Sequence, residues 1–155
     1  MKENKIVELF KQGFDCGQVV LSSFAQELGM DTKQTNKIAA SFGGGMFCGE
    51  TCGAVIGALM AIGLKYGHYL PNTSDTKNEN ISKIMEFREK FLMKYNSTVC
   101  RELLGYDISK PEEMKIILEK GLLFNFCPKL VSYVTEILGE ILSQDNTNGG
   151  EKNEN

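Results

Sequence analysis

Five cysteines are the residues of this chain best suited to chemistry. Four of them, Cys16, Cys52, Cys100 and Cys127, fall where the sequence predicts that a helix begins. The free N–H groups and the positive dipole end of a helix start stabilise a thiolate, and they lower a thiol pKa from about 8.5 toward roughly 3.5–7.5. A thiolate is both a nucleophile and a metal ligand, so this placement predicts redox chemistry or metal binding.

Capping residues and a proline mark these helix starts: Asp15 before Cys16, Thr51 before Cys52, Ser97 before Cys100 and Pro128 after Cys127. The fifth cysteine, Cys48, lies four residues before Cys52 on a predicted loop. This CxxxC pair fits two metal ligands, a vicinal redox pair, or a bystander thiol beside the site. Inert burial is the alternative for the other four thiols, because free cysteine often packs as a small hydrophobe.

One stretch, residues 41–67, is expected to position the site. Three consecutive glycines there lead into an apolar segment without charge. A helix that is apolar all round belongs in the middle of a small fold, and its glycines and alanines let other backbone approach closely. The loop glycines and the first glycine of the helix are predicted to let backbone N–H groups reach a bound group: Gly43, Gly44, Gly45 and Gly53.

The rest of the chain carries apolar residues at helical spacing and no alternation of period two. We therefore expect an all-α, single-domain bundle of about seven helices around the central small-residue helix. Residues 1–143 form this domain, and residues 144–155 are a disordered polar tail. Residues 70–80 are polar, contain a proline and are predicted to be a surface loop, with a helix over residues 82–95.

Composition excludes several classes of function. The net charge of -3 leaves no basic patch for nucleic acid, and the longest uncharged run is far shorter than the roughly 20 residues of a membrane helix. The N-terminus has no apolar signal core, so we expect a cytoplasmic protein. Five cysteines in such a protein favour metal binding or redox chemistry over structural disulfides, and the single histidine argues against a Ser-His-Asp hydrolase.

The ordered set of motifs resembles the C_GCAxxG_C_C family of redox-active proteins, found mostly in anaerobic bacteria and archaea. Residues 52–57 are CGAVIG, Cys16 lies upstream in DCGQVV, and Cys100 and the pair Cys127-Pro128 lie downstream. The family motif is GCAxxG, whereas here Thr51 precedes the cysteine and a glycine follows it, so the match is inexact. The resemblance covers roughly residues 14–142.

The resemblance implies that Cys16, Cys52, Cys100 and Cys127 are the four defining cysteines. It also implies a prosthetic group, and an iron–sulfur cluster is the candidate because some members carry a twin-arginine export signal. The leading hypothesis is an electron-transfer protein, rather than a substrate-turnover enzyme, in which the four thiolates ligate a cluster, most simply [2Fe–2S]. Such a carrier needs a redox partner protein, which the sequence does not identify.

Other hypotheses stay open at this point. A cluster-free protein would cycle a dithiol, either Cys48 with Cys52 or two of the four defining cysteines. Structural zinc is a third hypothesis, although only Cys48 and Cys52 form a close pair. A helical binding module would use Met85, Phe87, Phe91 and Met93 to dock a partner, and the Gly/Ala face of the central helix would alternatively pack a second copy.

Overall fold

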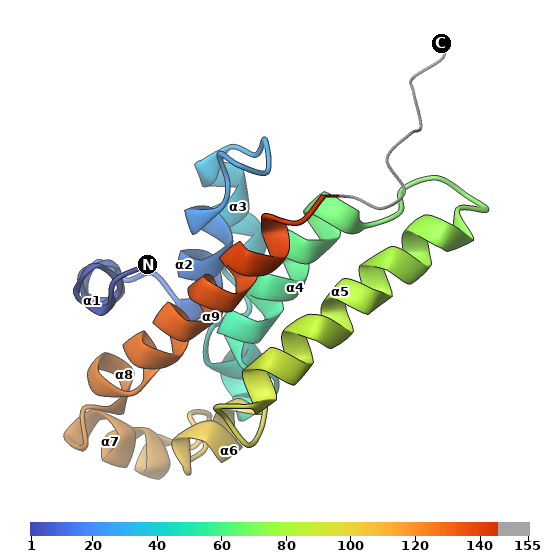
Figure 1. Cartoon of the computed structure of the whole chain (residues 1–155). Coiled ribbons are helices and arrows are strands. Elements are labelled where there is room, and N and C mark those ends of the chain that lie inside the picture. The colour runs from blue at the N-terminus through green and yellow to red at the C-terminus, as the bar shows by residue number, and fades with distance from the viewer. Residues whose placement is uncertain (146–155) are drawn as a thin grey trace.

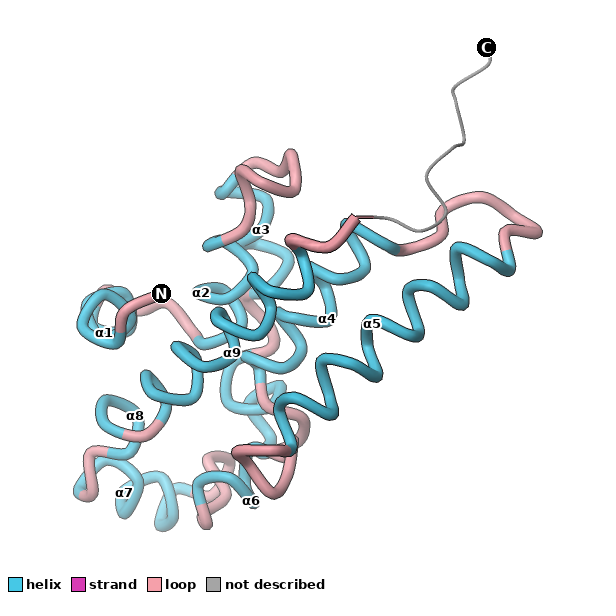
Figure 2. Tube along the Cα trace, in the orientation of Figure 1, coloured by secondary structure: helices cyan, strands magenta, loops and turns pink. Residues whose placement is uncertain are grey.

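The computed structural model describes residues 1–145, which form nine α-helices, one short π-helical segment and no strand. Figures 1 and 2 show helices linked by short loops along most of this trace. The elements are α1 (Glu3–Lys11), α2 (Cys16–Ser23), α3 (Thr32–Ala39), η1 (Gly45–Gly49), α4 (Gly53–Tyr66), α5 (Ser74–Leu92), α6 (Cys100–Leu104), α7 (Pro111–Glu119), α8 (Leu122–Asn125) and α9 (Cys127–Leu142). The predicted all-α class is confirmed, with two helices more than the expected seven.

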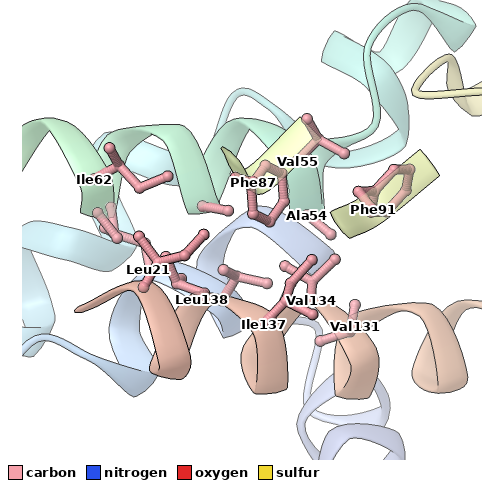
Figure 3. Packing of buried hydrophobic residues seen from close by; sticks show 14 of the residues in the cluster. Leu21, Ala54, Val55, Ile62, Phe87, Phe91, Val131, Val134, Ile137 and Leu138 are labelled. Atoms are coloured by element: carbon pink, nitrogen blue, oxygen red, sulfur yellow. The ribbon is translucent and has the colours of Figure 1, made fainter. Parts of the chain in front are cut away.

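The central helix is α4, which packs against α2, α5 and α9 (Figure 1). Eight of its fourteen residues are buried, as expected for a largely apolar helix in the middle of a small fold. Figure 3 shows Ala54 of α4 facing a row of apolar side chains from α9. Phe87 and Phe91 of α5 complete this core and are fully buried.

Glycines bring the backbones of α2 and α4 into direct contact. A Cβ atom built on Gly17 would lie 2.9 Å from the carbonyl oxygen of Gly53. A Cβ atom on Gly57 would lie 2.8 Å from the carbonyl oxygen of Gly17. No side chain larger than hydrogen fits at these positions, so the small-residue face of α4 packs inside the protein and sets α2 against it.

A second, smaller hydrophobic cluster lies apart from the main core. It is built on the buried residues Cys100, Leu104 and Ile117 and is covered by side chains from α7, from α8 and from the loop between α6 and α7. Cys52 belongs to the main core, and Cys16 packs against that core. Cys127 packs against the smaller cluster. The four defining cysteines therefore divide evenly between the two clusters.

Several predicted helix boundaries are wrong. α5 begins at Ser74, so most of the predicted loop over residues 70–80 is helical. Polar residues such as those at 75–80 are compatible with a helix, and the buried Phe87 and Phe91 anchor a helix long enough to extend through them. The apolar spacing also predicts that the helix after Asp15 runs to residue 28, whereas α2 ends at Ser23. The short helix α8 is not predicted at all.

Two of the four residues that were predicted to dock a partner belong to the core. Phe87 and Phe91 are fully buried, whereas Met85 and Met93 are 48% and 83% exposed. A helical binding module would therefore have only the two methionines of this set available. Among residues 1–145, no helix has the length and apolar character needed to cross a membrane.

The folded part of the chain extends into the predicted tail. The backbone oxygen of Gln144 accepts a hydrogen bond from the Tyr66 hydroxyl at 2.8 Å, and its side-chain amide donates to Glu86 at 2.9 Å. Gln144 thus fixes the end of α9 to α4 and α5. The remainder of the predicted tail, residues 146–155, lies outside the described residues.

Candidate four-thiol site

One cavity of about 180 Å³ is lined by all four defining cysteines, Cys16, Cys52, Cys100 and Cys127. These residues are separated by up to 111 positions in the sequence, and each comes from a different helix. Apolar side chains make up most of the remaining wall: Phe10, Phe14, Phe47, Leu103, Leu104, Ile108, Leu123, Phe124, Phe126, Leu130 and Val131. Four cysteine residues therefore share one cavity whose wall has few other side chains that could bind a metal.

Each of the four thiols lies at a helix start, as predicted. Cys16, Cys100 and Cys127 are the first residues of α2, α6 and α9. Cys52 is itself the N-cap residue of α4, one position earlier than expected. The predicted capping residue Asp15 forms a capping box with Gln18, whose side chain accepts the Asp15 N–H at 2.9 Å.

A short backbone bridge holds Cys52 and Cys100 on adjacent segments. The N–H of Cys52 donates to the carbonyl of Thr98 at 2.8 Å, and the N–H of Cys100 donates to the carbonyl of Glu50 at 2.7 Å. Thr51 and Val99 form the isolated antiparallel bridge between these two bonds. The two cysteines are thus fixed to one another through main-chain hydrogen bonds, independently of any bound group.

The glycine loop closes over Cys16 in an unusual backbone conformation. Gly44, Gly45, Met46 and Phe47 have positive φ in succession, at 55°, 64°, 58° and 55°. Left-handed backbone costs residues other than glycine about 1–2 kcal/mol each, and such strain concentrates at functional sites. The loop places Gly44 and Phe47 in the cavity wall and directs the backbone N–H of Gly44 to the sulfur of Cys16.

Two of the four predicted site glycines reach the sulfur atoms. Gly44 does so through its N–H, and Gly53 lies directly beneath Cys16. Gly43 instead makes room for the side chain of Asp15, whose Cγ would lie 2.5 Å from a Cβ atom at position 43. Gly45 packs on the backbone of Glu50.

The structure does not place Cys48 in the cavity wall. It is exposed, lies in η1, and donates a hydrogen bond from its thiol to the carbonyl of Gly45 at 3.3 Å. The CxxxC spacing therefore does not bring Cys48 into the site beside Cys52.

A model of the family described as "Putative redox-active protein (C_GCAxxG_C_C)" matches residues 14–141. The chain belongs to this family. The match spans all four defining cysteines and confirms the resemblance seen in the motifs. No curated protein and no solved structure matches the chain. The function class is accordingly that of a redox-active protein.

In this C_GCAxxG_C_C protein the expected lowering of thiol pKa holds for Cys16 alone. The pKa of Cys16 is lowered mainly because the Cys52 thiol donates a hydrogen bond to its sulfur, with further N–H bonds from Gly44 and Gly17. The same hydrogen bond and burial raise the pKa of Cys52. Burial raises the pKa of Cys100 to about 12 and also raises that of Cys127. Desolvation outweighs the helix dipole at these positions.

The donor set of this family member consists of four cysteine thiols that line one cavity. Four cysteines are the ligands that the common iron–sulfur clusters require. Within residues 1–145, the structure places no three Cys, His, Asp or Glu side chains so that they could hold a single metal ion.

Sequence reasoning misses the aromatic wall of the site. Five phenylalanines line the cavity: Phe10, Phe14, Phe47, Phe124 and Phe126. A local signal exists, because three of them, Phe14, Phe47 and Phe126, lie one or two positions before a cysteine. Phe10 and Phe124 have no such signal and reach the cavity only through the packing of α1 and α8.

Proposed function

We propose that the protein is an electron carrier in which Cys16, Cys52, Cys100 and Cys127 ligate an iron–sulfur cluster. One observation carries this proposal: thiols from four separate helix starts line a single apolar cavity. When bound, the cluster would supply one-electron transfer at a potential set by its surroundings. A [2Fe–2S] cluster is the simplest form that uses four thiolates.

The chain's own groups have definite roles in this function. Gly44 and Gly17 donate N–H groups to the sulfur of Cys16, and hydrogen bonds to cluster sulfurs adjust the reduction potential. The phenylalanine and leucine side chains of the wall would limit the access of water to the thiols. Phe47 and Phe124 both line the cavity and are 54% and 40% exposed. An electron would therefore leave toward this edge, where we expect the redox partner protein to dock.

Visible absorbance of the anaerobically purified protein tests this function. We expect a coloured protein that loses its absorbance when Cys16, Cys52, Cys100 or Cys127 is replaced by serine. Cys48→Ser is the matched control, because Cys48 lies outside the cavity wall, and this variant should stay coloured. A colourless wild-type protein with all thiols intact, or loss of colour in Cys48→Ser, would overturn the proposal.

A further inference from the structure

The thiols of Cys16 and Cys52 are joined by a direct hydrogen bond. The Cys52 thiol is the donor, and the sulfur of Cys16 is the acceptor. The absence of a side chain at position 53 makes this contact possible, because a Cβ atom there would lie 2.7 Å from Sγ of Cys16. Both residues sit on the main core, where the close glycine contact of α2 with α4 fixes their separation.

The other cysteines are less suited to pair with either of them. Cys48, the partner that the CxxxC spacing suggests for Cys52, points its thiol at the carbonyl of Gly45. Cys127 packs against the smaller hydrophobic cluster, and the side chain of Cys100 is buried in that cluster even though main-chain hydrogen bonds hold its segment beside that of Cys52. Of the pairings that the cysteines allow, the structure places only Cys16 and Cys52 in thiol–thiol contact by hydrogen bond within the described residues.

We propose that Cys16 and Cys52 form a reversible disulfide in the metal-free chain, with a small aliphatic disulfide as the oxidant. This inference concerns regulation of the four-thiol site and in that respect rests on the proposed function. Closing the disulfide would remove two of the four ligands, so the same oxidant that forms it would block filling of the site.

The reaction balances as two thiol–disulfide exchanges. The Cys16 thiolate attacks one sulfur of the small disulfide, which forms a mixed disulfide and releases one small thiolate. That thiolate takes the proton of Cys52, and the Cys52 sulfur then attacks Cys16, which releases the second small thiolate. Two protein thiols are oxidised and one small disulfide is reduced to two thiols. Cys16 is the attacking group because its side chain is partly exposed, whereas Cys52 is buried.

Disulfide mapping by mass spectrometry tests the pairing in the full-length, metal-free protein. The reduced chain is treated with 2-hydroxyethyl disulfide and digested with trypsin and a protease that cleaves after glutamate. Cleavage after Glu50 separates Cys48 from Cys52, so their linkages are distinguished. We expect a cross-link between the Cys16 and Cys52 peptides that dithiothreitol reverses. A Cys48–Cys52, Cys52–Cys100 or Cys100–Cys127 link in its place, or four unmodified thiols at Cys16, Cys52, Cys100 and Cys127, would overturn the proposal.

Two variants strengthen the test. Cys48→Ser, which changes an exposed residue, should form the cross-link as the wild type does. Cys52→Ser should accumulate the mixed disulfide at Cys16, with its fold checked by circular dichroism. Failure of either result contradicts the assignment of attacking and resolving thiols. The mapping needs no cluster, so a colourless protein that forms the Cys16–Cys52 link overturns only the proposed function, and a coloured protein that does not form it overturns only this inference.

Discussion

Gly53 lies directly beneath the sulfur of Cys16, where a Cβ atom would be 2.7 Å from Sγ and even closer to the carbonyl oxygen of Phe42. Real Cβ atoms do not approach other atoms so closely, and the Phe42 carbonyl belongs to the backbone and cannot yield cheaply. The glycine after Cys52 therefore does more than start a helix. It lets the first residue of α2 reach the first turn of α4, and this contact brings two of the four thiols together.

Replacing Gly53 by alanine should separate Cys16 from Cys52. We expect Gly53→Ala to lower the free energy of unfolding by about 1–3 kcal/mol, as overpacking of a filled core does. Gly63 in the same helix is the matched control, because a Cβ atom there meets nothing within 4 Å. Gly63→Ala should stabilise the protein by about 0.5–1 kcal/mol through better helix propensity. Urea unfolding of both variants measures this, and equal effects would show that Gly53 is not under steric constraint.

Met46 should tolerate glycine better than valine. Its φ of 58° lies in the left-handed region, and its side chain is 43% exposed, so little packing is lost on truncation. We expect Met46→Gly to be as stable as the wild type or up to about 1 kcal/mol more stable, because the backbone strain is relieved. Met46→Val should be less stable by more than about 1 kcal/mol. Thermal unfolding measures the order of stability of the three proteins. A Met46→Val variant more stable than Met46→Gly would contradict the positive φ of residue 46.

Cys100 should make the metal-free protein sensitive to alkaline pH. Burial raises the pKa of its thiol to about 12, whereas the thiol of the unfolded chain titrates near 8.5. Between these values the unfolded state binds fewer protons than the folded state, so stability is full below about pH 8.5 and falls as pH rises. Relative to Cys100→Ser, which cannot titrate, the wild type should lose about 1–2 kcal/mol between pH 8 and 10. A difference that stays constant with pH would contradict the buried state of this thiol.

The segment α6–α8 should open more readily than the main core when no group is bound. Its cluster rests on only three buried residues, Cys100, Leu104 and Ile117, whereas α4 and α9 contribute most of the larger core. Amide hydrogen exchange of the metal-free protein should therefore be faster in α6–α8 than in α4. Binding of a group to the four thiols should slow exchange in α6–α8, since it joins the two clusters. Equal amide exchange rates in α6–α8 and α4 of the metal-free protein would contradict the lower stability of α6–α8.

Local signals predicted the helix starts that carry the thiols to within a few residues, although Cys52 and Val99, instead of Thr51 and Ser97, are the N-cap residues of α4 and α6. Asp15 caps α2, and Pro128 lies in the first turn of α9, because both effects depend on residues close in sequence. The glycines of α4 likewise predicted a close contact with another backbone segment. They did not identify Gly17 of α2 as the residue that makes this contact.

The remaining features depend on contacts between distant residues. The bridge that ties Cys52 to Cys100 pairs Thr51 with Val99, and neither segment has a strand pattern. The thiol pKa values also could not be predicted, because burial of Cys100 and Cys127 outweighs the effect of their helix starts. The same holds for Cys48, whose spacing from Cys52 suggested a pair that the backbone of the glycine loop separates.

Iron and inorganic sulfide analysis of the anaerobically purified protein, beside Cys48→Ser and Cys100→Ser, tests the central claim most directly. We predict bound iron and inorganic sulfide in equal amounts in the wild type and in Cys48→Ser, and loss of both in Cys100→Ser. Iron-free wild-type protein with all five thiols reduced, or metal bound without inorganic sulfide, would contradict a cluster held by Cys16, Cys52, Cys100 and Cys127.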